Sequence, residues 1–536
     1  MMLPEDMRLW VDEDHLVWFV IDVIEGLDLT ALRSLGKPGK GRPGYDPVML
    51  AVLLVYAYLE AERSSRKIEA RCRTDAAFRV ATGNVIPDHS TICRFRGAAA
   101  GPGGPLEDVF TRVLFVMAAA GLGRLDVISV DGSKIWASAS KQANRTEDGL
   151  RRLARAILED AARADGQDCT CEGHEHGEAA GLDAAQACGC CDGGMLPGLG
   201  LDGPAVPAGG WGGASRARRI AAGLAQLQAA RIARGEQARA AAQAYLAAAA
   251  SGQAPRGAVP REVAVDVARL RLEQAIAADA ATDARWAAAG RDVPGRRRAG
   301  QETSKTRKAR QQLAAAVKAR RARDTAQAAQ EGTRRQPQPV RNITDPDSRL
   351  MHCTLRGLVQ AYNCQVPRTR DGVFLRPRAT TDPNDAAQLT PALDAITASQ
   401  QIIAAGHAAA GHPAFWSAAG TVLFDPGYFS QANCAAPGPD KLIGTGGTWK
   451  DTTPAHSPAC QHDDPRDQMA HNLSTRQGRD LYRHRAPVSE GGFADLKQRT
   501  GLRQFTMRGL PKVNGELLLA CLAANIGLYY RRTRTA

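Results

Sequence analysis

Aromatic residues are scarce in this 536-residue chain, at 5% of the sequence, and acidic residues are fewer than basic ones. A core must therefore be built mostly from aliphatic side chains, and a hydrophobic content of 44% is enough for a sizeable one. The formal net charge is +13. A basic excess favours a polyanionic partner, because each neutralised phosphate releases counterions, although a solvated basic surface without a partner has the same composition.

Long apolar runs and a secretory leader are also missing. The longest apolar stretches, Met49–Leu59 and Val113–Gly121, are too short to span a bilayer. The N-terminal segment is acidic and has no basic stretch before an apolar one, unlike a signal peptide. Most cysteines outside one cluster are scattered singly, as buried thiols are in a reducing compartment. We expect a soluble, cytoplasmic chain that does not associate with membranes.

The pattern along the chain changes three times. Residues 1–120 have helical periodicity, and residues 121–145 contain a short β-branched strand. Residues 146–341 are rich in Gly, Cys and His and then in Ala, Arg, Gln and Glu, which favour helix. Residues 342–536 return to mixed strand and helix signals. The order predicts an α/β domain interrupted by a large, basic helical insertion and preceded by an all-α domain.

Local signals predict individual elements. Pro47 opens a helix that is apolar almost all round, so we expect a buried core helix. A second helix is expected over Ser65–Ala81, and a third helix start at Asp88 or Ser90. Residues 435–480, rich in Pro, Gly, Asp and His, are expected to be loop.

Two aspartates follow short apolar strands. Asp131 ends the strand Val127–Val130 and is followed by an expected Gly-Ser turn, and Asp425 ends a strand before a Pro-Gly turn. Glu490 lies near the start of a later predicted helix that could lie against the same sheet. An Asp before Gly is also a common turn residue, so the spacing alone leaves both interpretations open.

Three converging carboxylates have a chemical meaning. They repel one another unless a hard divalent cation lies among them, and Mg²⁺ prefers carboxylate, water and phosphate oxygens. Two such ions about 4 Å apart can activate a water or a 3′-hydroxyl and stabilise the leaving oxygen. This arrangement is typical of phosphodiester cleavage.

Four segments in order resemble bacterial insertion-sequence transposases of the DDE class. The match covers most of residues 10–145 and 342–530, and any one segment alone would be weak. Residues 45–96 resemble the N-terminal helical domain of these transposases. Residues 130–144 and 424–433 resemble the two catalytic strands, and residues 489–526 resemble the C-terminal segment with the third carboxylate.

This resemblance implies an RNase H-like mixed sheet with flanking helices, formed by residues 121–145 and 342–536. It implies that Asp131, Asp425 and Glu490 are the catalytic residues and bind Mg²⁺ or Mn²⁺, as two ions. It further implies that the protein cleaves DNA at the ends of its own element and joins the 3′-hydroxyls to target DNA.

The resemblance also implies DNA-contacting residues. Lys497 follows Glu490 by seven residues and so lies on the same helix face; in related transposases a lysine at this place contacts DNA near the cleaved end. Tyr482 and Arg485 fit a Tyr-x-x-Arg signature, but four residues separate Arg485 from Glu490 where the pattern has three. Arg503 belongs to a basic strip that could follow phosphates.

The implied partner is double-stranded DNA, as terminal inverted repeats and as target, bound by a homodimer in the nucleoid. One alternative is a catalytically inactive or domesticated sequence-specific DNA-binding protein. The only sequence feature in its favour is the irregular spacing between Arg485 and Glu490. Another is a metal-dependent nuclease with other substrates, which a basic insertion and an N-terminal helical domain suit less well.

A cysteine and histidine cluster opens the insertion. Its candidate ligands are Cys169, Cys171, His174, His176, Cys188, Cys190 and Cys191. Zinc takes four such ligands, but C-x-C followed by C-x-C-C is not the usual C-x₂-C spacing. A structural Zn²⁺ site and a flexible linker that binds metal only adventitiously both fit the segment.

Overall fold

The computed structural model describes residues 6–36, 44–101, 103–168, 195–196, 206–207, 213–251, 259–288, 302–330, 339–353, 357–418, 420–446 and 463–535. The chain divides into two compact units. Residues 1–144 and 342–536 form one, and residues 145–341 form the other.

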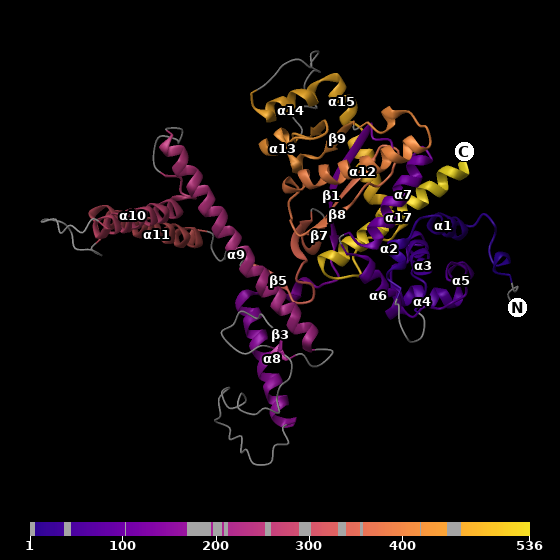
Figure 1. Cartoon of the computed structure of the whole chain (residues 1–536), viewed down its shortest axis with the longest axis horizontal. Coiled ribbons are helices and arrows are strands. Elements are labelled where there is room, and N and C mark those ends of the chain that lie inside the picture. The colour runs from indigo at the N-terminus through magenta and orange to yellow at the C-terminus, as the bar shows by residue number, and fades with distance from the viewer. Residues whose placement is uncertain are drawn as a thin grey trace. The chain divides into compact units, whose positions relative to one another are not determined.

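Seven helices precede the sheet in the described part of the first unit (Figure 1): α1 Leu16–Glu25, α2 Thr30–Arg33, α3 Pro47–Leu59, α4 Ser65–Thr74, α5 Ala76–Ala81, α6 His89–Ala99 and α7 Pro105–Ala119. Asp46 caps α3 by accepting from the Val48 amide, with Pro47 at the first helical position. Nearly every α3 side chain is buried, as its all-round apolar pattern predicts. Asp88 caps α6, one of the two expected starts.

A six-stranded mixed sheet follows, composed of β1 Val127–Trp136, β6 Arg349–Cys353, β7 Gly357–Thr369, β8 Arg378–Thr380, β9 Thr421–Phe424 and β10 Lys441–Ile443. The order is β10-β9-β1-β7-β6, with β8 also paired to β7. β1 runs antiparallel to β7 and parallel to β9, and β10 runs parallel to β9. The sheet therefore has an antiparallel part and a parallel part that meet at β1.

The remaining long helices of this unit are α12 Leu389–Ala409, α14 Pro465–Ser474, α15 Arg476–Tyr482, α16 Arg485–Arg499 and α17 Leu510–Thr535, with the short α13 Gln431–Ala435. One hydrophobic cluster joins the N-terminal helices to α16, α17 and β7, and a second packs β9 and β10 against α12. The N-terminal helices thus share a core with the last helix of the chain.

Helix α17 is the only described helix long and apolar enough to cross a membrane by length and composition. However, 78% of its apolar window is buried inside the protein. Its polar side chains are also satisfied there: the Asn525 side chain accepts from the Phe374 amide at 2.8 Å and donates to the Phe374 carbonyl at 2.9 Å. α17 is therefore built as a core helix, against which α3 and α7 pack.

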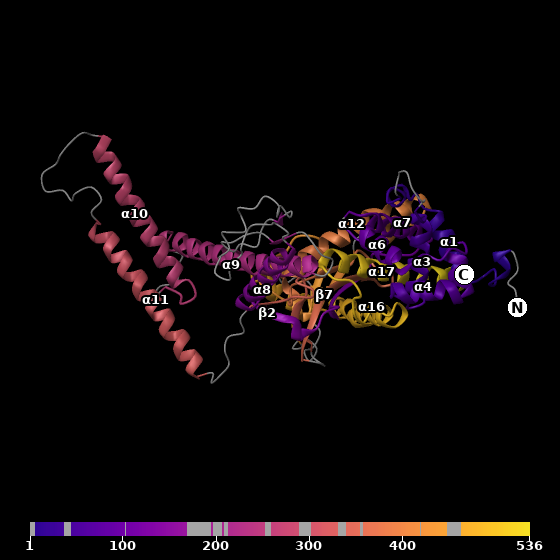
Figure 2. The ribbon, with the colours of Figure 1, turned by 90° about the horizontal axis from the view of Figure 1, so that it is seen from below.

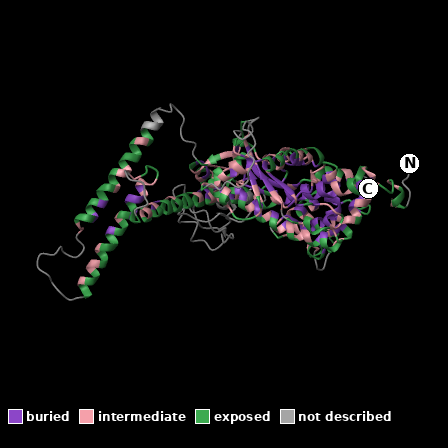
Figure 3. Ribbon diagram, turned by 90° about the horizontal axis from the view of Figure 1, so that it is seen from above, coloured by how far each residue is buried: buried purple, intermediate pink, exposed green. Residues whose placement is uncertain are grey.

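The second unit contains four long helices in its described part: α8 Glu147–Asp168, α9 Gly213–Ala250, α10 Ala264–Ala288 and α11 Ser304–Gln330. α10 and α11 pack side by side (Figure 2), and the hydroxyls of Thr303 and Thr306 donate to the Asp279 carboxylate. Short strand pairs join β3 Met195–Leu196 to β4 Val206–Pro207 and β2 Asn144–Thr146 to β5 Val340–Asn342. These long helices are mostly exposed, whereas the sheet is mostly buried (Figure 3).

Three local predictions are wrong. No turn interrupts β1 at Gly132-Ser133, because β7 pairs with β1 along its whole length. The helix expected over Ser65–Ala81 is divided, since the Asp75 side chain accepts from amides of the next segment and starts a new helix. Residues 435–480 are not simply loop, because they contain β10, α14 and most of α15.

Candidate active site

Asp131 and Asp425 lie at adjacent points of neighbouring strands. Val130 of β1 pairs with Phe424 of β9 in parallel register, so the two aspartates follow the last paired residues. The Asp425 carboxylate accepts from the Gly427 amide at 2.8 Å and starts a short 3₁₀ turn. Asp131 accepts from the Gly132 amide at 2.9 Å. Parallel pairing therefore brings together two carboxylates that are far apart in sequence.

The electrostatics of this pair disfavour two bare negative charges. Burial, and then the nearby Asp425 charge, raise the pKa of Asp131 to about 6. Burial and the nearby Asp385 charge raise the pKa of Asp425. The positive charge of Arg485 acts in the opposite direction on both carboxyl groups. A divalent cation placed here would relieve the repulsion.

Glu490 and Lys497 both line one cavity of about 420 Å³ together with Asp131 and Arg503. Both are on α16, whose opposite face is buried through side chains such as Leu496. Their seven-residue separation places them on the same side of the helix, as expected. Glu490 is exposed.

Lys497 is held at the edge of this cavity. Its Nζ lies 3.4 Å from the Ser133 Oγ and 5.5 Å from the ring centroid of Phe493. Since Ser133 follows Asp131 by two residues on β1, the ammonium lies beside the strand that carries this carboxylate.

The three predicted carboxylates are brought together only in part. Asp131 neighbours Asp425 across the sheet and shares the cavity with Glu490, but Asp425 does not line that cavity. Within the described residues, no group of three or more His, Cys, Asp or Glu side chains is arranged to hold a metal ion. Asp131 is therefore the one residue of the three that lies near each of the other two, Asp425 and Glu490.

The other predicted DNA-contacting residues differ in their exposure and in what they contact. Arg503 is exposed at the cavity, and Arg485 is near both aspartates. Tyr482 is buried, and its hydroxyl donates to the Phe424 carbonyl at 3.0 Å. Tyr482 therefore supports the strand that carries Asp425 instead of offering a surface to DNA.

A third aspartate at this place was missed by the sequence analysis. Asp385 follows β8 and precedes α12, and its negative charge raises the pKa of both Asp131 and Asp425. Its carboxylate accepts from the Asn363 and Gln365 amides at 2.7 and 2.8 Å. The surrounding sequence, Asp-Pro-Asn-Asp, has the composition of a turn or a helix cap. Yet the Asp385 side chain makes no capping hydrogen bond.

Two glycines leave room for this third carboxylate. A Cβ on Gly132 would lie 2.5 Å from the Asp385 Oδ1. A Cβ on Gly427 would lie 3.0 Å from the Asp425 Oδ1 and 3.4 Å from the Asp385 Oδ2. The absence of a side chain at both glycines lets carboxylate oxygens crowd together. Carboxylate oxygens are the donors that Mg²⁺ and Mn²⁺ prefer, although the described side chains are not arranged around a single metal position.

The cysteine and histidine cluster predicted as a zinc site, Cys169 to Cys191, lies outside the described residues. The zinc hypothesis stays a prediction.

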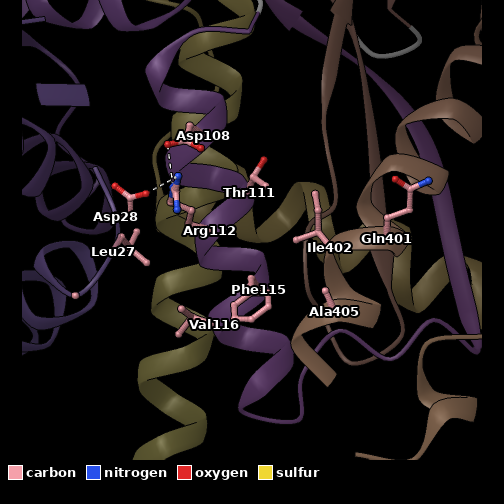
Figure 4. A pocket seen from close by; sticks show the side chains of 11 residues that line it. Leu27, Asp28, Asp108, Thr111, Arg112, Phe115, Val116, Gln401, Ile402 and Ala405 are labelled. Atoms are coloured by element: carbon pink, nitrogen blue, oxygen red, sulfur yellow. Dashed lines mark hydrogen bonds and ion pairs between the residues drawn. The ribbon is translucent and has the colours of Figure 1, made fainter. Parts of the chain in front are cut away.

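A second cavity of the same unit lies apart from these carboxylates. It has a volume of about 670 Å³ and is lined by α7, α12 and the segment Gly26–Asp28 (Figure 4). Arg112 forms ion pairs with Asp108 and Asp28 at 2.9 and 3.3 Å, so the guanidinium group of Arg112 already has partners. None of the predicted site residues lines this cavity.

Comparisons with known proteins match both ends of the chain. Residues 5–98 match a family described as a transposase domain (DUF772), and residues 450–529 match one described as a transposase DDE domain. The second segment contains Glu490 and Lys497, whereas Asp131 and Asp425 lie outside both. No curated protein and no solved structure matches the chain. The two matches, in the order that the sequence analysis expected, support an insertion-sequence transposase of the DDE class.

Proposed function

We propose that this transposase binds the terminal inverted repeats of its own insertion sequence and catalyses metal-dependent strand cleavage and strand transfer. The observation that carries the proposal is the position of Asp131 and Asp425, each directly after the last paired residue of two parallel strands, with Glu490 on the cavity that Asp131 lines. Family membership supplies the reaction class, and this geometry supports the assignment of residues to it.

The strand order supports an RNase H-like catalytic fold. β1, β7 and β8 form consecutive antiparallel neighbours, while β9 and β10 extend the sheet on the other side of β1 in parallel. Helix α12 connects the antiparallel part to β9. In open sheets, ligands bind where the strand order reverses, at the carboxyl ends of the strands. Asp425 directly follows β9, and Asp131 lies within β1, immediately after the residues that pair with β9.

The chain's own residues would divide the chemistry as follows. Asp131, Asp425 and Glu490 would hold two Mg²⁺ or Mn²⁺ ions, which when bound would activate the attacking hydroxyl and stabilise the leaving oxygen of an in-line phosphoryl transfer. Burial of the aspartates lowers the local dielectric and strengthens their attraction for cations. Arg485, near both aspartates, would bind the phosphate of the scissile strand.

DNA contacts are proposed for the cationic residues around the cavity. Lys497 and Arg503 line it together with Glu490 and can neutralise phosphates on either side of the cleaved bond. Tyr482 is no longer included, because its hydroxyl is engaged inside the protein. Joining two element ends requires two active sites, so the proposed working form is a homodimer on double-stranded DNA in the nucleoid.

The test uses the full chain and a duplex that carries one terminal repeat with its flanking DNA. Asp131→Asn, Asp425→Asn and Glu490→Gln are each expected to abolish Mg²⁺-dependent strand cleavage while DNA binding persists in a mobility-shift assay. Asp394→Asn is the matched control, because Asp394 is an exposed carboxylate of α12 away from the cavity. Cleavage that survives in all three site variants would refute the assignment.

The alternative of a domesticated DNA-binding protein makes the opposite prediction for the wild type. One observation favours it: the three carboxylates do not form a single group in the described structure. A wild-type chain that binds the repeat but cleaves nothing with Mg²⁺ or Mn²⁺ would decide for this alternative.

A further inference from the structure

We infer that Asp385 is an additional carboxylate of the cation site, held in place by an amide pair on β7 and neutralised by Lys134 when no cation is bound. The inference rests on the proposed function, because it takes Asp131 and Asp425 as cation ligands. It adds a residue from a different part of the chain to the three carboxylates of the proposed function.

The position of the Asp385 carboxylate is fixed on one side. Its Oδ1 accepts hydrogen bonds from the Asn363 Nδ2 at 2.7 Å and from the Gln365 Nε2 at 2.8 Å. These two residues alternate on β7 and so present their amides on the same face of the strand. Both are buried. Two buried donors on one oxygen orient the carboxylate and leave its other oxygen, Oδ2, directed away from β7.

The orientation of the Gln365 amide is itself determined by a neighbour. The Tyr428 hydroxyl donates to the Gln365 Oε1, so the Gln365 Nε2 must be the end that faces Asp385. Tyr428 is fully buried and belongs to the short turn that Asp425 starts. The segment that carries one proposed ligand therefore fixes the partner that holds Asp385.

The other carboxylate oxygen of Asp385, Oδ2, lies toward Asp425. The point that a Cβ on Gly427 would occupy is 3.4 Å from the Asp385 Oδ2 and 3.0 Å from the Asp425 Oδ1. On the other side, the Asp385 carboxylate packs directly over the Cα of Gly132, next to Asp131. Glycine at both positions is thus explained by one carboxylate between the two aspartate-bearing strands.

Lys134 supplies the only ion pair recorded for Asp385 in the described structure. Its Nζ lies 3.4 Å from both carboxylate oxygens, and both side chains are mostly buried. This distance is long for a charge-assisted hydrogen bond, which is typically 2.7–2.9 Å. At this distance the Lys134 ammonium balances the negative charge of Asp385 but forms only weak hydrogen bonds with the carboxylate. A divalent cation could therefore replace the ammonium.

The direct test is Mn²⁺ binding to the full chain without DNA, followed by the EPR signal of free Mn²⁺. Asp385→Asn is expected to weaken binding about 10- to 100-fold, and Asp385→Glu, which keeps the charge, is expected to recover part of the loss. The control Asp394→Asn should bind as the wild type does. Thermal melts in EDTA identify any variant that fails to fold. Wild-type affinity in a folded Asp385→Asn protein would overturn the inference.

Two further variants probe the arrangement without removing a carboxylate. Gly132→Ala keeps every charge but places a methyl group 2.5 Å from the Asp385 Oδ1, so weaker Mn²⁺ binding is expected and unchanged binding would contradict the geometry. Lys134→Met removes the competing ammonium, so affinity should be equal to or higher than that of the wild type. Weaker binding by Lys134→Met would contradict its role as a replaceable counter-charge.

Failure of the inference can be told apart from failure of the proposed function. If Asp131→Asn abolishes Mn²⁺ binding while Asp385→Asn does not affect it, only the role of Asp385 is refuted. If neither variant changes the affinity, the cation site itself is misplaced.

Discussion

Replacing Asp131 with asparagine should make the metal-free protein more stable at neutral pH, although it removes a proposed catalytic group. The pKa of Asp131 in the folded chain is about 6, against an ordinary value of 3.8. Because the folded-state pKa is the higher one, the folded state binds the proton more tightly, and stability falls as pH rises from about 4 through about 6. Above this window the ionised carboxylate destabilises the fold.

The size of the effect follows from the shift. A difference of about two pKa units corresponds to about 3 kcal/mol. Asp131 is only partly buried, so solvent screening reduces this figure, and about 1–2 kcal/mol is the expected gain for Asp131→Asn at pH 8. At pH 4 most of the gain should vanish, because the wild-type carboxyl group is then protonated in the folded state.

Urea unfolding in EDTA, at several pH values between 4 and 8, measures this difference, with Asp394→Asn as the control. Added Mg²⁺ should reduce the advantage of the variant, because binding to the folded wild type stabilises it by mass action. A variant that is less stable than the wild type at pH 8, or a difference that does not depend on pH, would refute the electrostatic reasoning.

Two further predictions concern other parts of the chain. Glu516→Ala should destabilise the protein by about 3–5 kcal/mol in urea unfolding, because Glu516 is fully buried and its loss leaves the mostly buried Arg63, its partner at 2.9 Å, without a counter-charge; a loss below about 1 kcal/mol would contradict this. Helix α11 has eight basic residues and one acidic residue. Seven of the basic residues are exposed, and four of these, spread along the helix, are Arg307, Arg310, Lys318 and Arg321. Changing these four residues to glutamine should reduce the magnitude of the slope of log K against log salt for DNA binding by about 3 to 4 units, because each phosphate contact contributes about 0.9. An unchanged slope would mean that the phosphate contacts lie elsewhere in the protein.

The sequence predicts the parts of the site that depend on local pattern. A run of β-branched and aliphatic residues before Asp131, and another before Asp425, predicts two strands, and the structure pairs them in parallel. The helix that carries Glu490 and Lys497 is likewise local, and their shared face follows from the helical period. The roles of these residues in cation and DNA binding remain predictions.

Asp385 could not be recognised in the same way. Its neighbourhood in sequence, Asp-Pro-Asn-Asp, has the composition of a turn or cap, and nothing in it signals a site. Its partners on β7 are an amide pair whose polar character gives no catalytic signal. Only the pairing of β7 with β1 brings them beside Asp131, and strand register over such a distance is not encoded in local periodicity.

The prediction for residues 435–480 failed for a related reason. β10 is only three residues long and lies between segments rich in Pro and Gly, so its strand character comes from pairing with β9 and not from its own composition. The buried end of β10 is also held by a tertiary contact, since the Ile443 amide donates to the Met469 sulfur.

The packing of α17 against α3 and α7 makes the folding of the N-terminal helices depend on a distant part of the chain. The helix that completes the core of the N-terminal helices follows them in the chain only after the insertion and the whole sheet. β1 likewise waits for β7 and β9, which follow the insertion. Such long-range contacts form late and leave partly made chains incompletely folded. We therefore expect a polypeptide that stops before α17 to lack part of the core that the N-terminal helices share with it, and to be less stable than a chain that includes α17.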